Sequence, residues 1–122
     1  QDRWNELDRD PRVTIWTALD DSTVENGCMI VLPGSHKLGL INESSAFFTE
    51  EQCRDFEARF DSVVLEFRAG ESVVLHNWLL HTSGINRSTR PRRAFSVAYM
   101  DAATRASNGR EFSVIFGDGG ES

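Results

Sequence analysis

The 122 residues of this chain are enough for one domain of ordinary size. Hydrophobic residues make up 39% of the sequence and aromatic residues 10%, which is enough for a packed core and argues against disorder. The formal net charge of −6 and the isoelectric point near 5.0 argue against nucleic acid or an anionic membrane as the main partner. No apolar run approaches the roughly 18 residues needed to span a bilayer.

The first half of the chain predicts two strands and one helix. Residues 13–20 alternate between two sets of side chains, as a strand with both faces largely covered would, and 28–32 form a short apolar run that ends at a Pro-Gly pair. Thr49 and Gln52 have the spacing of a capping box, in which each side chain bonds the backbone of the other. This pair predicts the start of a short helix over 50–60.

The second half predicts three more strands, at 62–67, 72–76 and 93–101. A last apolar piece follows at 112–116, and GDGGES at 117–122 is typical of a flexible tail. Five or six short strands with turn signals between them, and a single helix, predict an all-β fold. An antiparallel sandwich or a jelly-roll barrel has this pattern.

Two features of the first half have simple interpretations. The acidic segment 20–27, DDSTVENG, is typical of a solvated turn. Cys28 and Cys53 stand alone, without a CxxC motif or zinc-like spacing, so we expect two free thiols and an intracellular, cytoplasmic protein.

The segment 76–93 carries the densest set of chemically useful side chains. His81 follows the predicted strand 72–76, and an arginine cluster precedes the next strand: Arg87, Arg90, Arg92 and Arg93. Imidazole is a common ligand of iron, copper, nickel and zinc, and guanidinium is the preferred bidentate partner of a carboxylate. The hairpin therefore predicts a metal and a carboxylate held side by side, with a solvated arginine-rich turn as the alternative.

Several stretches of the chain match a known family. The segments QDRW, TIWTALDD, ENGCMIVLPGSHK and HNWLLHTSGINRSTRPRR closely resemble the phytanoyl-CoA dioxygenase family of Fe(II)- and 2-oxoglutarate-dependent oxygenases. The resemblance runs from Gln1 to about Asp101. It implies a double-stranded β-helix, which is a jelly roll, and this agrees with the strand count reached from the pattern alone.

The resemblance also implies an iron site. Asp2 matches the carboxylate ligand of the family's His-x-Asp motif, with Gln1 as its middle residue, and His81 matches the distal histidine ligand. His36 and His76 match recurrent histidines of the family that do not bind iron, and we expect structural roles for both.

A cosubstrate site is implied in the same way. Arg92 matches the arginine that pairs with the far carboxylate of 2-oxoglutarate, and Ser83 matches the hydroxyl that joins it. Gln1 and Trp16 match positions that line the cosubstrate pocket.

The family's first histidine ligand would stand immediately before Gln1. We therefore expect residues 1–122 to be the C-terminal portion of a single oxygenase domain, a jelly roll incomplete at its N-terminus. On this interpretation the chain alone would be inactive. Sheet edges left without partners could also recruit other strands, so self-association is possible.

The activity implied is hydroxylation of an aliphatic C–H bond in a small molecule or an acyl-CoA, with O₂ and 2-oxoglutarate consumed. An acid at Asp2 favours hydroxylation over halogenation, because halogenating relatives have a small residue there. Two alternatives remain open at this point: a non-catalytic jelly-roll module that binds a small molecule, and a cupin-type metal enzyme that uses no oxoacid. Arg92 distinguishes them, because neither alternative needs an anchor for a second carboxylate.

Overall fold

Six strands form two antiparallel sheets within residues 1–117, the part of the chain that the computed structural model describes. The strands are β1 (Val13–Ala18), β2 (Met29–Val31), β3 (Val63–Leu65), β4 (Ser72–His76), β5 (His81–Ser83) and β6 (Ala94–Tyr99). Their orders in the two sheets are β4-β1-β6 and β3-β2-β5. Apart from Gly117, the tail expected at 117–122 lies outside the described residues.

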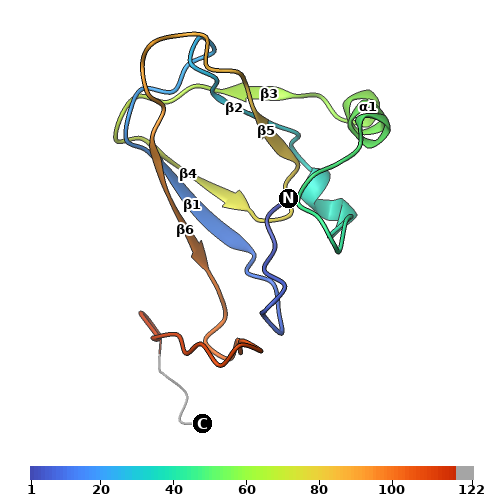
Figure 1. Ribbon diagram of the computed structural model, residues 1–122, viewed down its shortest axis with the longest axis vertical. Coiled ribbons are helices and arrows are strands. Elements are labelled where there is room, and N and C mark those ends of the chain that lie inside the picture. Colours follow the sequence, from blue (N-terminus) through green and yellow to red (C-terminus); the bar gives the residue numbers. More distant parts are fainter. Residues whose placement is uncertain (118–122) are drawn as a thin grey trace.

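The two sheets face each other as the layers of an open jelly roll. Figure 1 shows them joined by connections at one end and separated at the other, where the N-terminus lies. The rings of Trp16 on β1 and Phe67, just after β3, contact each other across the gap, with centroids 5.2 Å apart. The all-β jelly-roll fold expected from the sequence is confirmed, and its sheets do not close on each other.

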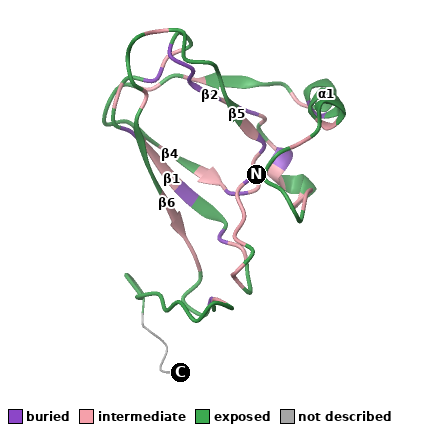
Figure 2. Ribbon diagram, viewed as in Figure 1, coloured by how far each residue is buried: buried purple, intermediate pink, exposed green. Residues whose placement is uncertain are grey.

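The sheet β4-β1-β6 has one buried face and one exposed face. Thr14 and Ala18, on the same side of β1, are both buried. The opposite face carries Val74 of β4 and Phe95 of β6, which are 66% and 60% exposed. In Figure 2 the buried positions concentrate on the central strands and nearby loops, whereas β3 and most of the helix are exposed. The interior of the fold therefore lies between the two sheets.

The helix α1 spans Glu50–Arg59 and begins at the predicted capping box. The Thr49 hydroxyl accepts from the backbone N–H of Gln52 at 3.2 Å, and the Gln52 side-chain oxygen accepts from the backbone N–H of Thr49 at 3.0 Å. One helical side chain, Phe56, is buried, and its ring meets Phe48 edge to face. A 3₁₀ helix at Ser35–Leu38 lies between β2 and α1.

We expect Thr49→Ala to lower the free energy of unfolding by about 1 kcal/mol, because the capping hydroxyl satisfies an otherwise unpaired backbone N–H. Urea denaturation followed by circular dichroism measures the change. Thr89→Ala is the matched control, because Thr89 is exposed and its hydroxyl makes no hydrogen bond to another described residue. Equal losses in the two variants would show that the cap contributes nothing specific.

The observed strands are shorter than most of the predicted segments. Val13–Ala18 lies within the predicted 13–20, and only Ser72–His76 coincides with its prediction. The three-residue strand His81–Ser83 was not predicted, and the apolar piece 112–116 forms no strand. Both differences have the same cause. A strand is defined by its hydrogen bonds to a neighbouring strand, and the sequence of a short segment carries little information about which neighbour it will pair with.

Two further expectations concern the cysteines and membrane-spanning segments. Cys28 and Cys53 are both free thiols, the first buried and the second exposed. No helix within the described residues is long and apolar enough to cross a bilayer.

Candidate metal and cosubstrate site

Asp2 and His81 meet where the two sheets separate. Asp2 Oδ1 lies 4.0 Å from His81 Nε2, although the two residues are far apart in the sequence. Both side chains are partly exposed, so the pair is accessible from solvent. The structure thus brings together the two residues predicted as metal ligands.

The register of β5 directs the His81 side chain. His81 pairs with Val31 of β2, and Ser83 pairs with Met29. Val31 and Met29 are buried, so His81 and Ser83 share the inner face of the sheet. His81 Nδ1 lies 2.9 Å from the carbonyl oxygen of Leu79 and must donate to it, because a carbonyl only accepts. This hydrogen bond leaves the Nε2 lone pair free on the side of Asp2.

Asp2 is held in place by its neighbour and by the connection after β4. The Asp2 backbone N–H donates to the carbonyl of Asn77 at 2.9 Å. The buried Gln1 amide donates to the carbonyls of Gly39 and Trp78, at 2.8 and 2.7 Å, and accepts from the backbone N–H of Ile41 at 3.0 Å.

These bonds change the interpretation of Gln1. Both of its N–H donors are used by backbone carbonyls, so neither is free for a cosubstrate. Gln1 instead ties the N-terminal segment to two loops and thereby orients Asp2. A lining role in the cosubstrate pocket stays a prediction.

Asn77 is a part of the site that the sequence did not indicate. It is 1% exposed, its side-chain oxygen accepts from the Thr14 hydroxyl at 2.7 Å, and its backbone carbonyl holds Asp2. A lone asparagine next to a strand end gives no signal of this role, because its partners lie far away in sequence.

His36 and His76 lie together, and within the described residues neither joins Asp2 and His81 in a group that could hold a metal ion. Their ring centroids are 5.1 Å apart, and His76 Nδ1 accepts from the backbone N–H of Trp78 at 3.0 Å. Burial lowers the pKa of His76, and electrostatic interactions with His36 and Arg12 lower it further. A neutral ring whose Nδ1 accepts a hydrogen bond fits a structural histidine.

Among the arginines of the 87–93 cluster, Arg92 differs from its neighbours. Arg90 is paired with Glu25 at 3.2 Å and Arg93 with Asp20 at 2.9 Å, and both arginines are exposed. Arg92 is half-buried, and its side chain makes no ion pair or hydrogen bond within residues 1–117. A half-buried cation without an acid is available to an anionic ligand.

Strand alternation predicts that Arg92 faces the inner side. Ala94, the first residue of β6, pairs with the buried Ala18, and Arg92 lies two residues before it, so an alternation that continues past the strand end would turn Arg92 the same way. Burial and the charge of Glu66 raise the pKa of the Cys28 thiol, and the positive charge of Arg92 opposes this shift. Arg92 therefore lies near the start of β2, in the other sheet.

Trp16 and Ser83 complete the predicted set on the inner faces. Trp16 is half-buried and pairs with Ser96 on β6, on the same side as Ala18. Ser83 is exposed and its hydroxyl has no hydrogen-bond partner among the described residues. Their roles toward a cosubstrate stay predictions.

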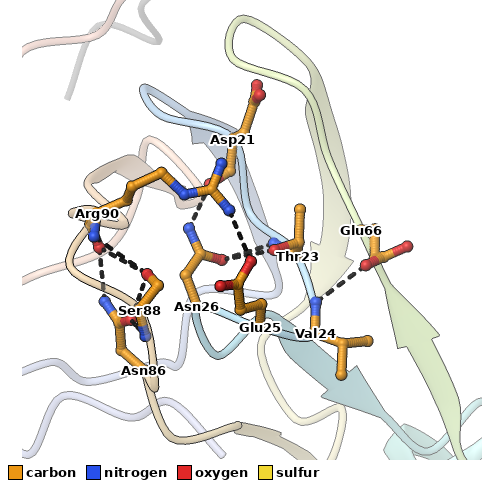
Figure 3. A network of polar contacts seen from close by, with 9 residues as sticks. All are labelled: Asp21, Thr23, Val24, Glu25, Asn26, Glu66, Asn86, Ser88 and Arg90. Atoms are coloured by element: carbon orange, nitrogen blue, oxygen red, sulfur yellow. Dashed lines mark hydrogen bonds and ion pairs between the residues drawn. The ribbon is translucent and has the colours of Figure 1, made fainter.

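The connection between β5 and β6 is fixed by polar contacts to the turn before β2 (Figure 3). Asn86 donates its side-chain N–H to the carbonyl of Arg90 at 2.8 Å, and the Arg90 guanidinium reaches Glu25. Inside the turn, Asn26 accepts from the backbone N–H of Thr23 at 2.7 Å. The turn that the sequence predicted to be merely solvated therefore braces the arginine-bearing segment.

The Asp2–His81 pair fits a divalent iron. A carboxylate and a neutral imidazole are two of the three ligands of the facial triad used by non-haem Fe(II) oxygenases. Their separation of 4.0 Å does not exceed the sum of two metal–ligand bonds of about 2.0–2.2 Å each. Within residues 1–117, no third His, Cys, Asp or Glu side chain joins them.

Comparison with known proteins identifies the family. The family model described as Phytanoyl-CoA dioxygenase (PhyH) matches residues 2–94, which is most of the chain and includes both Asp2 and His81. The chain belongs to the phytanoyl-CoA dioxygenase family. Among curated relatives in this family, "Phytanoyl-CoA dioxygenase" of Arabidopsis thaliana is 34% identical over 92 residues, covering 72% of this chain and 32% of that protein. "Phytanoyl-CoA dioxygenase, peroxisomal" of Homo sapiens is 32% identical over 96 residues, covering 74% and 28%.

Solved structures agree with this family assignment. The epimerase SnoN, in complex with Fe³⁺, alpha ketoglutarate and nogalamycin RO, is 33% identical with a TM-score of 0.64, covering 79% of this chain and 38% of SnoN. The alpha ketoglutarate-dependent carbocyclase SnoK is 30% identical with a TM-score of 0.66, covering 83% and 42%. The chain therefore spans about a third of the length of the curated relatives and slightly more of these structures.

Proposed function

We propose that the protein carrying this chain is an Fe(II)- and 2-oxoglutarate-dependent dioxygenase that hydroxylates an aliphatic C–H bond of a small molecule or an acyl-CoA. The observation that carries the proposal is the approach of Asp2 Oδ1 and His81 Nε2 to 4.0 Å at the open end of the fold. The phytanoyl-CoA dioxygenase family supports the reaction class.

In this proposal Asp2 and His81 hold the iron. The hydrogen bond to Leu79 keeps Nε2 of His81 as the donor atom toward the metal, and the bonds of Gln1 and Asn77 keep Asp2 oriented. A histidine immediately before Gln1, where the family motif has one, would supply the third protein ligand from outside these residues. The chemistry that bound iron supplies is O₂ activation coupled to oxidation of 2-oxoglutarate to succinate and CO₂.

The cosubstrate is held by the chain's own polar groups. Arg92 pairs with the far carboxylate of 2-oxoglutarate, and Ser83 adds a hydroxyl donor. Support comes from the half-buried position of Arg92 and the lack of an acid partner for it within residues 1–117. This feature also favours an oxoacid-dependent enzyme over a jelly-roll binder or a cupin-type enzyme, since neither needs such an anchor.

The remaining expectations stay proposals. A small-molecule substrate and O₂ follow from the reaction class. Association through exposed sheet edges remains an expectation, and within the described residues the edge strands are β3, β4, β5 and β6. The cytoplasmic location also stays a proposal, and the human relative is named peroxisomal.

The test is iron-dependent succinate formation from 2-oxoglutarate by the intact protein. We expect His81→Ala to lower Fe(II) affinity by more than about 100-fold, since loss of a supporting residue alone costs 10–100-fold, and to abolish succinate formation. His36→Gln is the matched control, because His36 packs on His76 and, within the described residues, does not join the pair in a group that could hold a metal, and it should keep iron binding. Undiminished iron binding by His81→Ala would refute the assigned ligand set.

A further inference from the structure

The start of β6 is bound tightly to Asp20. The Arg93 guanidinium donates from Nε and Nη2 to the two Asp20 carboxylate oxygens, both at 2.9 Å, and the Arg93 backbone N–H donates to Oδ2 at 2.8 Å. The Arg93 carbonyl accepts from the backbone N–H groups of Leu19 and Asp20. Asp20 thus binds both the backbone and the side chain of Arg93.

The contacts between Arg93 and Asp20 bear on the direction of the preceding side chain, Arg92. Successive side chains of an extended segment point to opposite faces. The Arg93 side chain is 71% exposed, and a continuation of the β6 alternation to these residues predicts that Arg93 faces the outer side and Arg92 the inner side, with Ala94. If Arg93 were released, the residues before β6 could rotate and Arg92 would lose its fixed direction.

We propose that Asp20 is a positioning residue for the cosubstrate anchor: by binding Arg93 it holds Arg92 toward the space between the sheets. The inference rests on the role of Arg92 in the proposed function. Asp20 touches neither metal nor cosubstrate, and it acts entirely through Arg93.

The neighbouring ion pair shows why Asp20 and not Glu25 has this role. Glu25 makes one side-chain contact, 3.2 Å from Arg90, and both groups are exposed. Asp20 makes three contacts, and the side-chain and backbone hydrogen bonds from Arg93 lower the pKa of Asp20 to about 2, so it is ionised at every working pH.

The test compares two oxoacids in the intact protein. 2-Oxoglutarate carries the far carboxylate that Arg92 would hold, whereas pyruvate has the same oxoacid end without it. Dissociation constants are measured by calorimetry with Mn(II) in place of iron and O₂ excluded, so that no turnover occurs. The variants are Asp20→Asn, Arg93→Lys, Glu25→Gln as the matched control, and Arg92→Lys.

For Asp20→Asn we expect 2-oxoglutarate to bind about tenfold more weakly, the value of one charge-assisted hydrogen bond, while the affinity for pyruvate stays unchanged. Arg93→Lys should likewise weaken the binding of 2-oxoglutarate and leave the affinity for pyruvate unchanged. This variant tests the same inference if Asp20→Asn folds poorly. Glu25→Gln should leave both affinities unchanged.

Two results would overturn the inference. Wild-type affinity for 2-oxoglutarate in Asp20→Asn and Arg93→Lys would show that Arg92 is oriented without this pair. An equal loss for both oxoacids would show general structural damage. The proposed function fails separately, if Arg92→Lys itself leaves 2-oxoglutarate binding unchanged.

Discussion

Arg92→Lys is expected to raise the 2-oxoglutarate requirement of the intact protein by about 10- to 100-fold, which corresponds to the loss of a hydrogen bond to a charged group. Lysine keeps the positive charge but has no planar fork, so it cannot pair with a carboxylate through two parallel hydrogen bonds. The KM for 2-oxoglutarate, measured by succinate release at saturating substrate and iron, reports the effect. Turnover at saturating 2-oxoglutarate should change far less.

Arg87→Lys is the matched control for this prediction. Arg87 belongs to the same cluster and is exposed, and its side chain makes no ion pair or hydrogen bond to another described residue. The substitution should leave the KM for 2-oxoglutarate unchanged. If both lysine variants raise it equally, the cluster acts through its net charge, and Arg92 is not a specific anchor.

The strands that the sequence predicted are those with strong apolar alternation or long apolar runs. Residues 13–20 contain β1, the central strand of one sheet, and residues 72–76 form β4, an edge strand of the same sheet. The strand His81–Ser83 has no such signal, because its sequence is polar and its place depends on pairing with β2. Residues 112–116 have the composition of a strand, but within the described residues they pair with nothing.

The candidate site was predictable where a motif carried the chemistry. Asp2, His81 and Arg92 were identified because their residue types and spacing match a family pattern, and the structure brings the first two together. The bonds that orient them were not predictable. Gln1 binds the backbone of three residues in two distant loops, and no local pattern encodes such partners.

The acidic turn at 20–27 shows that charge patterns in the sequence do not predict which acid pairs with which arginine. The sequence contains several acids in 20–27 and several arginines in 87–93, and any pairing among them is compatible with the spacing. The fold selects Asp20 with Arg93 and Glu25 with Arg90, and among residues 1–117 it pairs no acid with Arg92. Which arginine is available to a ligand therefore follows from three-dimensional pairing, although the family pattern pointed to the same residue.

Gly27 brings this turn into direct contact with the connection between β5 and β6. The hairpin expected there from the sequence does not form, because β5 and β6 pair in different sheets. A Cβ atom at Gly27 would lie 2.5 Å from the carbonyl oxygen of Gly84 and 3.0 Å from the backbone nitrogen of Asn86. Both obstacles are backbone atoms, so relief requires the connection itself to move. The Gly84 N–H also donates to the carbonyl of Cys28 at 3.1 Å, and a displaced connection would lose this bond as well.

We expect Gly27→Ala to lower the free energy of unfolding by about 2–4 kcal/mol, of which about 1 kcal/mol comes from the positive φ and the rest from overpacking. Gly34→Ala separates the two causes. Gly34 has the same φ of 85°, but a Cβ atom there would meet nothing within 4 Å, so only the backbone cost of about 1 kcal/mol applies. Urea denaturation of both variants measures the difference. Equal destabilisation would mean that Gly27 is needed for its backbone angle alone and that the connection between β5 and β6 tolerates a side chain against it.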